Sequence, residues 1–381
     1  MLLSFWPVAE ARSTGGSLSG VIVHEWLEAH GGAEKVVEQL ARLYPDAAIK
    51  SLWNDAPDRF SAERVSETWL ARTPLRRHKS AALPFMPSTW RHLGRNDADW
   101  ILCSSHLFAH HARFSGPSRG ADKFVYAHTS ARYIWNPELD ERGKSPLIKL
   151  AAQPLMRIDR TRAQEAKSIA ANSQFVQRRL ERAWLRESRV IYPPVEVQRF
   201  AGNQGYLTPI EENLLASLPD TFLLGASRFI PYKRLDLVIK AGRAADLPVV
   251  LAGDGPLLPR FERIAAEKAG ALHIIRSPSH VLLRELFRRS LAYVFPAVED
   301  FGIMPVEAMA TGAAVIASSV GGTAETVIDG KTGALLEVFD DHHLRAAVDR
   351  AGRVRAEDAV ARAWQFDESV FRRRIAEWIG E

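Results

Sequence analysis

The stretch Val21-Ile22-Val23-His24 is a short β-branched run, and Gly31-Gly32 and an amphipathic segment up to Leu43 follow it. A buried strand, a glycine turn and a helix in this order form the first part of a βαβ unit. Strand-like and helix-like segments then alternate along the chain, which is typical of parallel sheets covered by helices on both faces. The other expected strands are residues 100–103, 124–127, 168–171, 190–191, 222–225, 248–251, 272–275, 292–295 and 314–316. Helical patterns cover residues 147–165, 173–184, 340–364 and 367–379.

This alternation is interrupted once, at Tyr192-Pro193-Pro194 and the polar stretch 201–212. Two consecutive prolines fit neither a helix interior nor a central strand, so we expect a hinge or linker here. The sequence therefore predicts an α/β protein with two Rossmann-like, doubly wound domains, 20–200 and 201–364. Ligands are expected at the carboxyl ends of the strands.

Composition excludes several classes of protein. A chain of 381 residues exceeds one ordinary core, and its 46% apolar and 25% charged residues are typical of globular proteins. Cys103 is the single cysteine, which excludes an intramolecular disulfide and a cysteine-based metal cage. No apolar stretch is long enough to span a bilayer. Residues 1–19 lack the basic start of a signal peptide and read as a loose extension, so we expect a cytoplasmic protein.

The most informative segment runs from Glu299 to Glu307. It follows a predicted strand and opens a predicted helix, so Glu299 falls in the loop and Glu307 just inside the helix. Free backbone N–H groups at Gly302 and Ile303 would face an anionic or hydroxyl-rich ligand. The alternative is that Glu299 is a solvated loop acid and that Glu307 offsets the helix dipole.

A basic loop, Ser227 to Arg234, directly follows the first strand of the second domain. Arg228 offers a planar fork and Lys233 a point charge, which together suit a diphosphate. A basic loop taken alone is more often solvated surface.

In the first domain, the paired glycines Gly31 and Gly32 would let a backbone approach a phosphate closely. His128 ends a predicted strand and opens onto a loop rich in Arg, Tyr and Trp, a composition typical of a polyol-binding cleft. A structural role for this histidine is the alternative. Asp97 and Asp99 lead into a strand instead of following one, so we predict no metal site.

Taken together, these segments resemble the retaining glycosyltransferases of family 4, which have the two-domain GT-B fold. The resemblance is greatest to the bacterial α-mannosyltransferase-like branch that builds surface polysaccharides. It is carried by residues 23–27, 31–34, 128–129, 132–133, 135, 171–173, 175–176, 191–195, 199–200, 227–228, 231–236, 253–256 and 299–307.

The resemblance implies roles for the second-domain residues. Arg228 and Lys233 would bind the donor diphosphate. Glu299 and the backbone of Phe301, Gly302 and Ile303 would hold the donor sugar. Glu307 would accept hydrogen bonds from the ribose. The base-binding loop would be residues 276–279, where Pro278, next to Ser279, replaces a small aliphatic residue and removes one backbone donor.

It also implies roles for the first domain and for the last helix. His128 would contact the sugar near its reacting face, and Gly31 and Gly32 would approach the diphosphate across the cleft. Ser130 stands where a proline is common in the family. The helix within 365–381 would cross back onto the first domain. Glu299, His128, Lys233 and Arg228 would form the catalytic set.

The implied reaction moves a sugar, first of all mannose from GDP-mannose, to a glycan or a polyprenyl- or other lipid-linked acceptor. It needs the nucleotide sugar as co-substrate and no cofactor. The alternatives are another GDP- or UDP-sugar, or a nucleotide-sugar-binding protein without catalysis. A glycoside phosphorylase, an epimerase and a nucleic-acid binder lack support in the motifs.

Residues 68–96 predict a peripheral contact with an anionic membrane on the cytoplasmic face. The segment carries six basic residues and no acidic one, and apolar and aromatic residues are interleaved. Such a surface is attracted to anionic lipid headgroups. Pro74, Pro84 and Pro87 break any long amphipathic helix, which favours the alternative of core residues under an ordinary solvated face.

Overall fold

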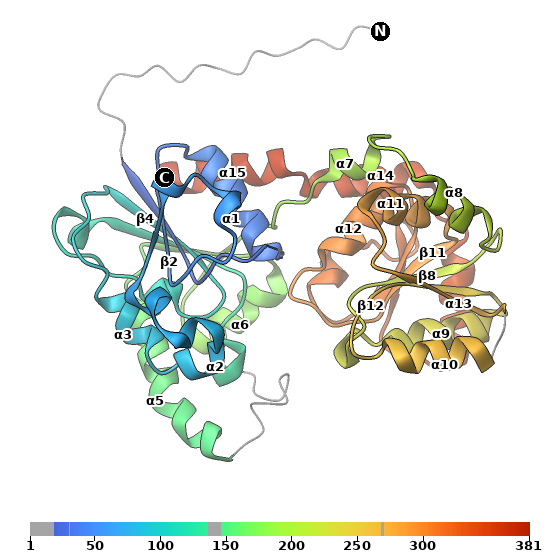
Figure 1. Ribbon diagram of the computed structural model, residues 1–381, viewed down its shortest axis with the longest axis horizontal. Helices are drawn as coiled ribbons and strands as arrows, with labels where there is room; N and C mark the ends of the chain where they lie inside the picture. The colour runs from blue at the N-terminus through green and yellow to red at the C-terminus, as the bar shows by residue number, and fades with distance from the viewer. Residues whose placement is uncertain (1–18, 30, 136–145, 268–269) are drawn as a thin grey trace, which may run out of the picture.

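The computed structural model describes residues 19–29, 31–135, 146–267 and 270–381, which form two lobes, each built on a parallel sheet (Figure 1). Apart from Ser19, the expected N-terminal extension lies outside the described residues. Both lobes have the alternating strands and helices that the sequence predicts, so the fold-class prediction is confirmed.

The first lobe contains a seven-stranded sheet of order β3-β2-β1-β4-β5-β6-β7. Its strands are β1 (Gly20–His24), β2 (Ala48–Ser51), β3 (Val65–Glu67), β4 (Trp100–Ser105), β5 (Asp122–Ala127), β6 (Ser168–Ala171) and β7 (Arg189–Val190). Its helices are α1 (Gly32–Leu43), α2 (Lys79–Ala82), α3 (Met86–Arg91), α4 (Arg132–Trp135), α5 (Pro146–Ala163) and α6 (Gln174–Trp184).

The second lobe contains a six-stranded sheet of order β10-β9-β8-β11-β12-β13. Its strands are β8 (Leu223–Ala226), β9 (Val249–Gly253), β10 (Leu272–Arg276), β11 (Ala292–Phe295), β12 (Val315–Ser318) and β13 (Gly333–Leu336). The helices from α7 on are α7 (Val197–Ala201), α8 (Pro209–Ala216), α9 (Leu235–Ala245), α10 (Leu258–Glu267), α11 (His280–Arg289), α12 (Ile303–Ala310), α13 (Asp341–Ala351), α14 (Ala356–Ala363) and α15 (Glu368–Gly380).

Each sheet is covered on both faces, which explains why its strands read as continuous apolar runs. In β1, Val21 and Val23 pack into one core layer of the first lobe, whereas Ile22 packs into the layer on the other face. All five residues of β1 are buried. Because the strands of a lobe are parallel, the loops at their carboxyl ends are gathered at one edge of each sheet.

The chain passes between the lobes twice, and the two passages lie side by side. Val195 N donates to Phe366 O at 3.0 Å, and Val195 pairs with Asp367 in an isolated bridge. Beyond this point α15, red in Figure 1, returns to the first lobe. Its Phe371 and Trp378 pack in the same core layer as Ile22.

Several details differ from the expectations. Strands β2, β3 and β13 were not predicted; β2 and β3 include exposed residues, so they lack the continuous apolar run of the other strands. The expected linker 201–212 contains the start of α8. Thr208 and Glu211 cap this helix start with a reciprocal capping box. Val195, Val197 and Phe200, on the N-terminal side of the predicted boundary, pack in the core of the second lobe.

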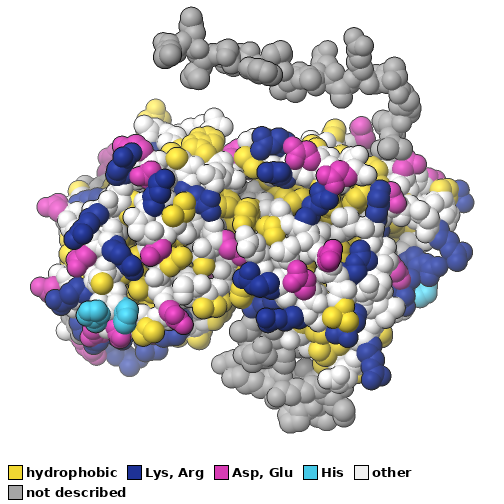
Figure 2. All heavy atoms as spheres, turned by 180° about the vertical axis from the view of Figure 1, so that it is seen from behind, with side chains coloured by type: hydrophobic (Ala, Val, Ile, Leu, Met, Phe, Trp, Pro, Cys, Tyr) yellow, Lys and Arg dark blue, Asp and Glu magenta, His cyan; other side chains and the backbone are white. Residues whose placement is uncertain are grey.

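Positive and negative side chains are interspersed over both lobes on the face shown in Figure 2. Within the described residues, no helix is both long and apolar enough to cross a membrane.

Candidate active site

An ion pair between two predicted site residues lies at the carboxyl edge of the second sheet. Lys233 Nζ donates to Glu299 Oε1 at 2.6 Å, and the two side chains are only 13% and 19% exposed. Lys233 comes from the 3₁₀ turn Pro231–Lys233 after β8, and Glu299 from the loop after β11. Strands β8 and β11 are neighbours in the sheet, so residues 66 positions apart become partners.

Arg228 lies in the same loop as Lys233, but its side chain is exposed. Its Nη2 is 3.5 Å from Tyr232 Oη. Lys233 therefore provides a fixed positive charge at the edge of the sheet, and Arg228 an accessible one. Both are the groups that a diphosphate would require.

The start of α12 brings backbone donors to the same place. Gly302 precedes the helix with φ +92°, and a Cβ there would lie 2.4 Å from Thr323 Oγ1, so only glycine fits. Phe301 is buried beneath this turn, and Ile303 opens the helix. A Cβ at Gly32 would lie 3.1 Å from Ile303 Cδ1, so Gly32 of the first lobe lies against the start of α12; its approach to a diphosphate stays a prediction. Gly31 directly precedes α1.

Glu307, one helical turn into α12, has a partner that the sequence did not reveal. Lys35 Nζ, on α1, lies 3.5 Å from Glu307 Oε1 and 3.0 Å from Glu196 Oε2. Burial raises the pKa of Glu307, and Lys35 offsets only part of that effect. Burial alone would lower the pKa of Lys35, but the negative charges of Glu307 and Glu196 outweigh this effect, so the pKa of Lys35 is raised.

His128 lies at the end of β5 within a cluster of histidines. Its Nε2 is hydrogen-bonded to Ser104 Oγ at 2.8 Å, and its ring centroid is 6.3 Å from those of His24 and His106. Burial lowers the pKa of His128 well below the ordinary value, and the neighbouring histidines lower it further. His128 is therefore a neutral imidazole at physiological pH.

Glu25, in the same cluster, is held firmly by the loop after β4. Its Oε1 accepts hydrogen bonds from Ser105 Oγ and from the backbone N–H groups of His106, Leu107 and Ala109. Burial works against ionisation, but the charges of His106 and His24 and these backbone donors lower the pKa of Glu25 to about 2.

Asp300 connects the two lobes directly beside Glu299. Its carboxylate is ion-paired with Arg132 of α4 and lies 2.7 Å from Arg179 of α6. Ser173 Oγ donates to Asp300 O at 2.5 Å. The loop that carries Glu299 is therefore attached to three side chains of the first lobe.

The predicted base-binding loop ends at Pro278 and Ser279. Ser279 Oγ accepts a hydrogen bond from Leu282 N at 3.1 Å and so caps α11. Ser277 has φ +41°, a left-handed conformation that turns the loop at this point.

Asp97 and Asp99 have other partners. Asp99 Oδ2 accepts from Ser19 N at 2.8 Å, and Asp97 pairs with Arg95 at 3.3 Å. Folding nevertheless gathers histidines and acids whose spacing along the chain gave no signal. Among the described residues, groups with the composition of a metal site are His24–Glu25–His106, His110–His111–Asp159 and Asp340–His342–His343.

Sequence reasoning missed Lys35 and the role of Asp300. Lys35 directly follows Gly31-Gly32-Ala33-Glu34, and Asp300 lies inside the acidic segment, but nothing in their spacing reveals a partner in the other lobe. The described site combines one fixed and one accessible cation, backbone donors at a helix start, two acids and a neutral histidine. Such a set can bind a sugar diphosphate and stabilise negative charge on a leaving phosphate.

Comparison with known proteins agrees with this geometry. Residues 30–199 match the family model "Glycosyltransferase Family 4", and residues 209–358 match "Glycosyl transferases group 1". A Mycolicibacterium smegmatis protein named GDP-mannose-dependent alpha-(1-6)-phosphatidylinositol monomannoside mannosyltransferase is 29% identical over 204 residues, which are 48% of this chain and 53% of that one. A Mycobacterium bovis D-inositol 3-phosphate glycosyltransferase is 31% identical over 202 residues, 46% of this chain and 40% of the relative.

The chain thus spans about half or less of the length of these curated relatives. Among solved structures, Anabaena Alr3699/HepE in complex with UDP superposes with a TM-score of 0.70 at 18% identity, covering 95% of this chain and 99% of that one. The two facing Rossmann-like lobes and the helix that crosses back therefore define a GT-B protein. With family models matching both lobes, the chain belongs to glycosyltransferase family 4.

Proposed function

We propose that this protein transfers a hexose from a nucleotide sugar to a glycan or lipid-linked acceptor with retention of configuration, and that GDP-mannose is the first donor to test. The observation that carries the proposal is the Lys233–Glu299 pair beside the start of α12. Breaking a sugar–diphosphate bond develops negative charge on the leaving oxygen. Arg228, Lys233 and the N–H groups at the helix start are suited to stabilise that charge.

Glu299 would hold the hydroxyl groups of the donor sugar, and Glu307 those of the ribose. His128, as a neutral imidazole, would hydrogen-bond the sugar near the reacting carbon. Glu25 is a first-lobe acid, but one of its oxygens is already engaged by four donors. We therefore assign it a structural role, and infer that the acceptor hydroxyl attacks from the face of the departing phosphate, which takes its proton.

The identity of the donor nucleotide can be tested directly by binding. One relative is named for GDP-mannose, whereas the Anabaena protein of similar fold has UDP in its complex. The experiment is a thermal-shift screen with GDP, UDP and ADP, followed by transfer and hydrolysis assays with the matching sugar nucleotides. A ligand at 100-fold its Kd should add about 2.7 kcal/mol of stability. Binding without transfer or hydrolysis would favour the silent-binder alternative.

We further propose a peripheral membrane contact through a smaller surface than residues 68–96 as a whole. Leu70, Met86 and Trp90 of that segment are buried core. Trp69 and Phe85 are 52% and 46% exposed, with ring centroids 6.3 Å apart. We group these two rings with Arg72 and Arg77, which are exposed in the same segment, and call the four residues the aromatic–basic patch. Such a patch suits the headgroup region of an anionic bilayer.

A further inference from the structure

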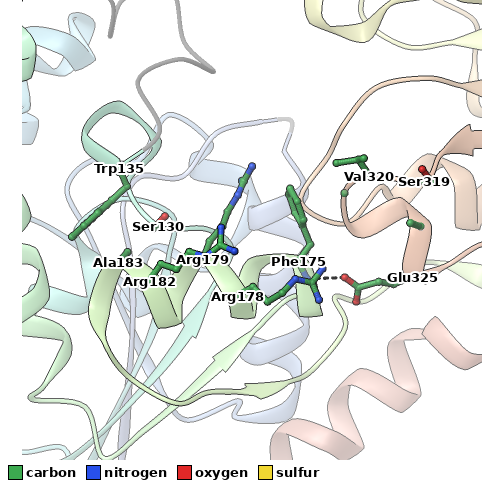
Figure 3. A pocket seen from close by; sticks show the side chains of 12 residues that line it. Ser130, Trp135, Phe175, Arg178, Arg179, Arg182, Ala183, Ser319, Val320 and Glu325 are labelled. Carbon is green, nitrogen blue, oxygen red and sulfur yellow. Dashed lines mark hydrogen bonds between the residues drawn. The ribbon is translucent and has the colours of Figure 1, made fainter. Parts of the chain in front are cut away.

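A cavity of about 630 Å³ lies beside the proposed donor site, between the lobes (Figure 3). Side chains of α4 and α6 form its first-lobe wall, and the loop after β12 forms the opposite wall. None of the donor-binding residues assigned above is among its lining residues.

The first-lobe wall is strongly basic. Arg178, Arg179 and Arg182 all line the cavity, and their spacing of three and four residues puts them on one face of α6. Arg179 is bound to Asp300 and stacks on the ring of Phe175 at 4.2 Å, whereas Arg178 and Arg182 are exposed.

One acid, Glu325, is among the described residues that line the cavity, against three arginines, and it is bound at the start of α6. Its carboxylate accepts the backbone N–H groups of Gln174 at 2.8 Å and Phe175 at 2.7 Å. The cavity therefore keeps an excess of positive charge that suits an anion.

Ser130 supplies an independent sign of a polar ligand. Its side chain is fully buried and lines the cavity, yet its Oγ has no hydrogen-bond partner within the described part of the chain. Burying a hydroxyl without a partner costs free energy, so such groups are rare in folded proteins unless they serve a purpose. A ligand oxygen in the cavity would satisfy it.

The cavity also adjoins the place where the donor sugar would sit. A Cβ at Gly321, which lines the cavity, would lie 2.9 Å from the backbone oxygen of Glu299. Ser130 follows His128 by two residues. The aromatic side chain of Trp135 lines the same space and offers a flat apolar surface to a sugar ring; Phe175 lines it too, with Arg179 over its ring.

We propose that this cavity binds an anionic sugar, a ring carrying a phosphate or a carboxylate, as the acceptor of the reaction. Arg178 and Arg182 bind the anionic group, Ser130 bonds to a ligand oxygen, and the ring packs against Trp135. The assignment rests on the proposed transferase function and adds the chemical class of its acceptor.

Calorimetric titration of the full chain tests this assignment. The protein is first saturated with whichever nucleoside diphosphate binds, so that Arg228 and Lys233 are occupied. Glucose 6-phosphate, glucuronate and uncharged glucose are then titrated separately. Binding of glucose 6-phosphate at least about tenfold tighter than glucose supports a phosphate-bearing acceptor, and the same result for glucuronate supports a carboxylate. Equal affinity of all three overturns the proposal. Failure of every nucleoside diphosphate to bind, seen in the first titration, counts against the donor site instead.

Variants locate the binding to this cavity. Arg182→Ala should weaken binding of the charged sugar by about tenfold. Arg119→Ala removes the same charge from the exposed turn before β5 and should leave it unchanged. Ser130→Ala should raise the Tm of the protein and weaken the binding of the charged sugar. A hydroxyl with a purely structural role does not produce this pair of opposite effects. Wild-type affinity in both Arg182→Ala and Ser130→Ala overturns the site.

Discussion

Lys233 Nζ and Glu299 Oε1 lie 2.6 Å apart, so each of the two side chains that we assign to the donor already compensates the charge of the other. Both are largely buried, and removing one leaves the other as an unpaired charge in a partly desolvated place. Loss of activity in a single variant therefore mixes chemistry with the cost of that unpaired charge.

We expect Lys233→Ala to lower turnover by roughly 10²- to 10³-fold, because a preorganised cation no longer faces the leaving diphosphate. Glu299→Ala should abolish transfer while nucleoside diphosphate still binds, because Glu299 contacts the sugar. Steady-state kinetics and calorimetry check these two outcomes. Near-wild-type transfer by either variant contradicts the assignment.

The double variant Lys233→Ala/Glu299→Ala separates stability from catalysis. Its free energy of unfolding should be higher than the value expected if the losses in the two single variants simply added. The reason is that the double variant leaves no unpaired charge. Its turnover should be no better than that of Glu299→Ala. Additive stability effects in urea denaturation would show that the pair is not coupled.

Glu25 should make the protein sensitive to acid. Its folded-state pKa of about 2 lies below the ordinary value of 4.5, so the ionised carboxylate stabilises the fold above pH 4.5. That contribution, about 3 kcal/mol at pH 7, is lost as the pH falls from 4.5 towards 2.

Urea denaturation of wild type and Glu25→Gln at pH 7 and pH 3 measures this effect. The stability difference should be large at pH 7 and should shrink towards about 1 kcal/mol at pH 3. Glu187→Gln, at an exposed position, is the matched control and should track wild type at both values. A pH-independent difference would refute the role of the Glu25 charge.

Transfer should persist in excess chelator. The groups proposed to bind the diphosphate are the cations Arg228 and Lys233 and neutral backbone N–H donors, and Asp97 and Asp99 are engaged with Arg95 and Ser19. Activity is measured after dialysis against EDTA and again after addition of Mn²⁺ or Mg²⁺. Strict dependence of activity on the added ion would contradict this prediction and indicate a metal site in one of the histidine clusters. The variants His24→Ala and His111→Ala would then show which of the two clusters binds the ion.

The aromatic–basic patch should bind anionic liposomes at low salt and release them as salt rises, because the attraction is screened. Trp69→Ala/Phe85→Ala and Arg72→Glu/Arg77→Glu should each reduce co-sedimentation. Arg76→Glu and Lys79→Glu are poorer tests, because these residues pair with Asp55 and Glu28. Failure of the wild-type protein to sediment at low salt excludes the contact.

Much of this architecture was predictable, because apolar strands buried on both faces leave a local signal in the chain. The position of Glu307 inside a helix and of Lys233 after a strand follow from the same local patterns. Partners across the lobes left no such signal. Lys35 and Glu307 are 272 positions apart in the sequence, and Arg132 and Asp300 are 168 apart, so only the assembled fold brings the members of each pair together. The cavity near Ser130 has the same origin, because its walls come from both lobes.

Helix α15 has a consequence for how the protein is made. The second lobe is a continuous segment of chain from Val195 to Phe366, so it can complete its core as soon as that segment leaves the ribosome. The first lobe emerges earlier but must wait, because Phe371, Ile375 and Trp378 fill one layer of its core. Until residues 368–380 have been synthesised, the sheet face around Ile22, Phe124 and Tyr126 is an exposed apolar surface on a nascent chain. Premature termination shortly before α15 would therefore yield a protein with every donor-binding residue present and a strong tendency to aggregate.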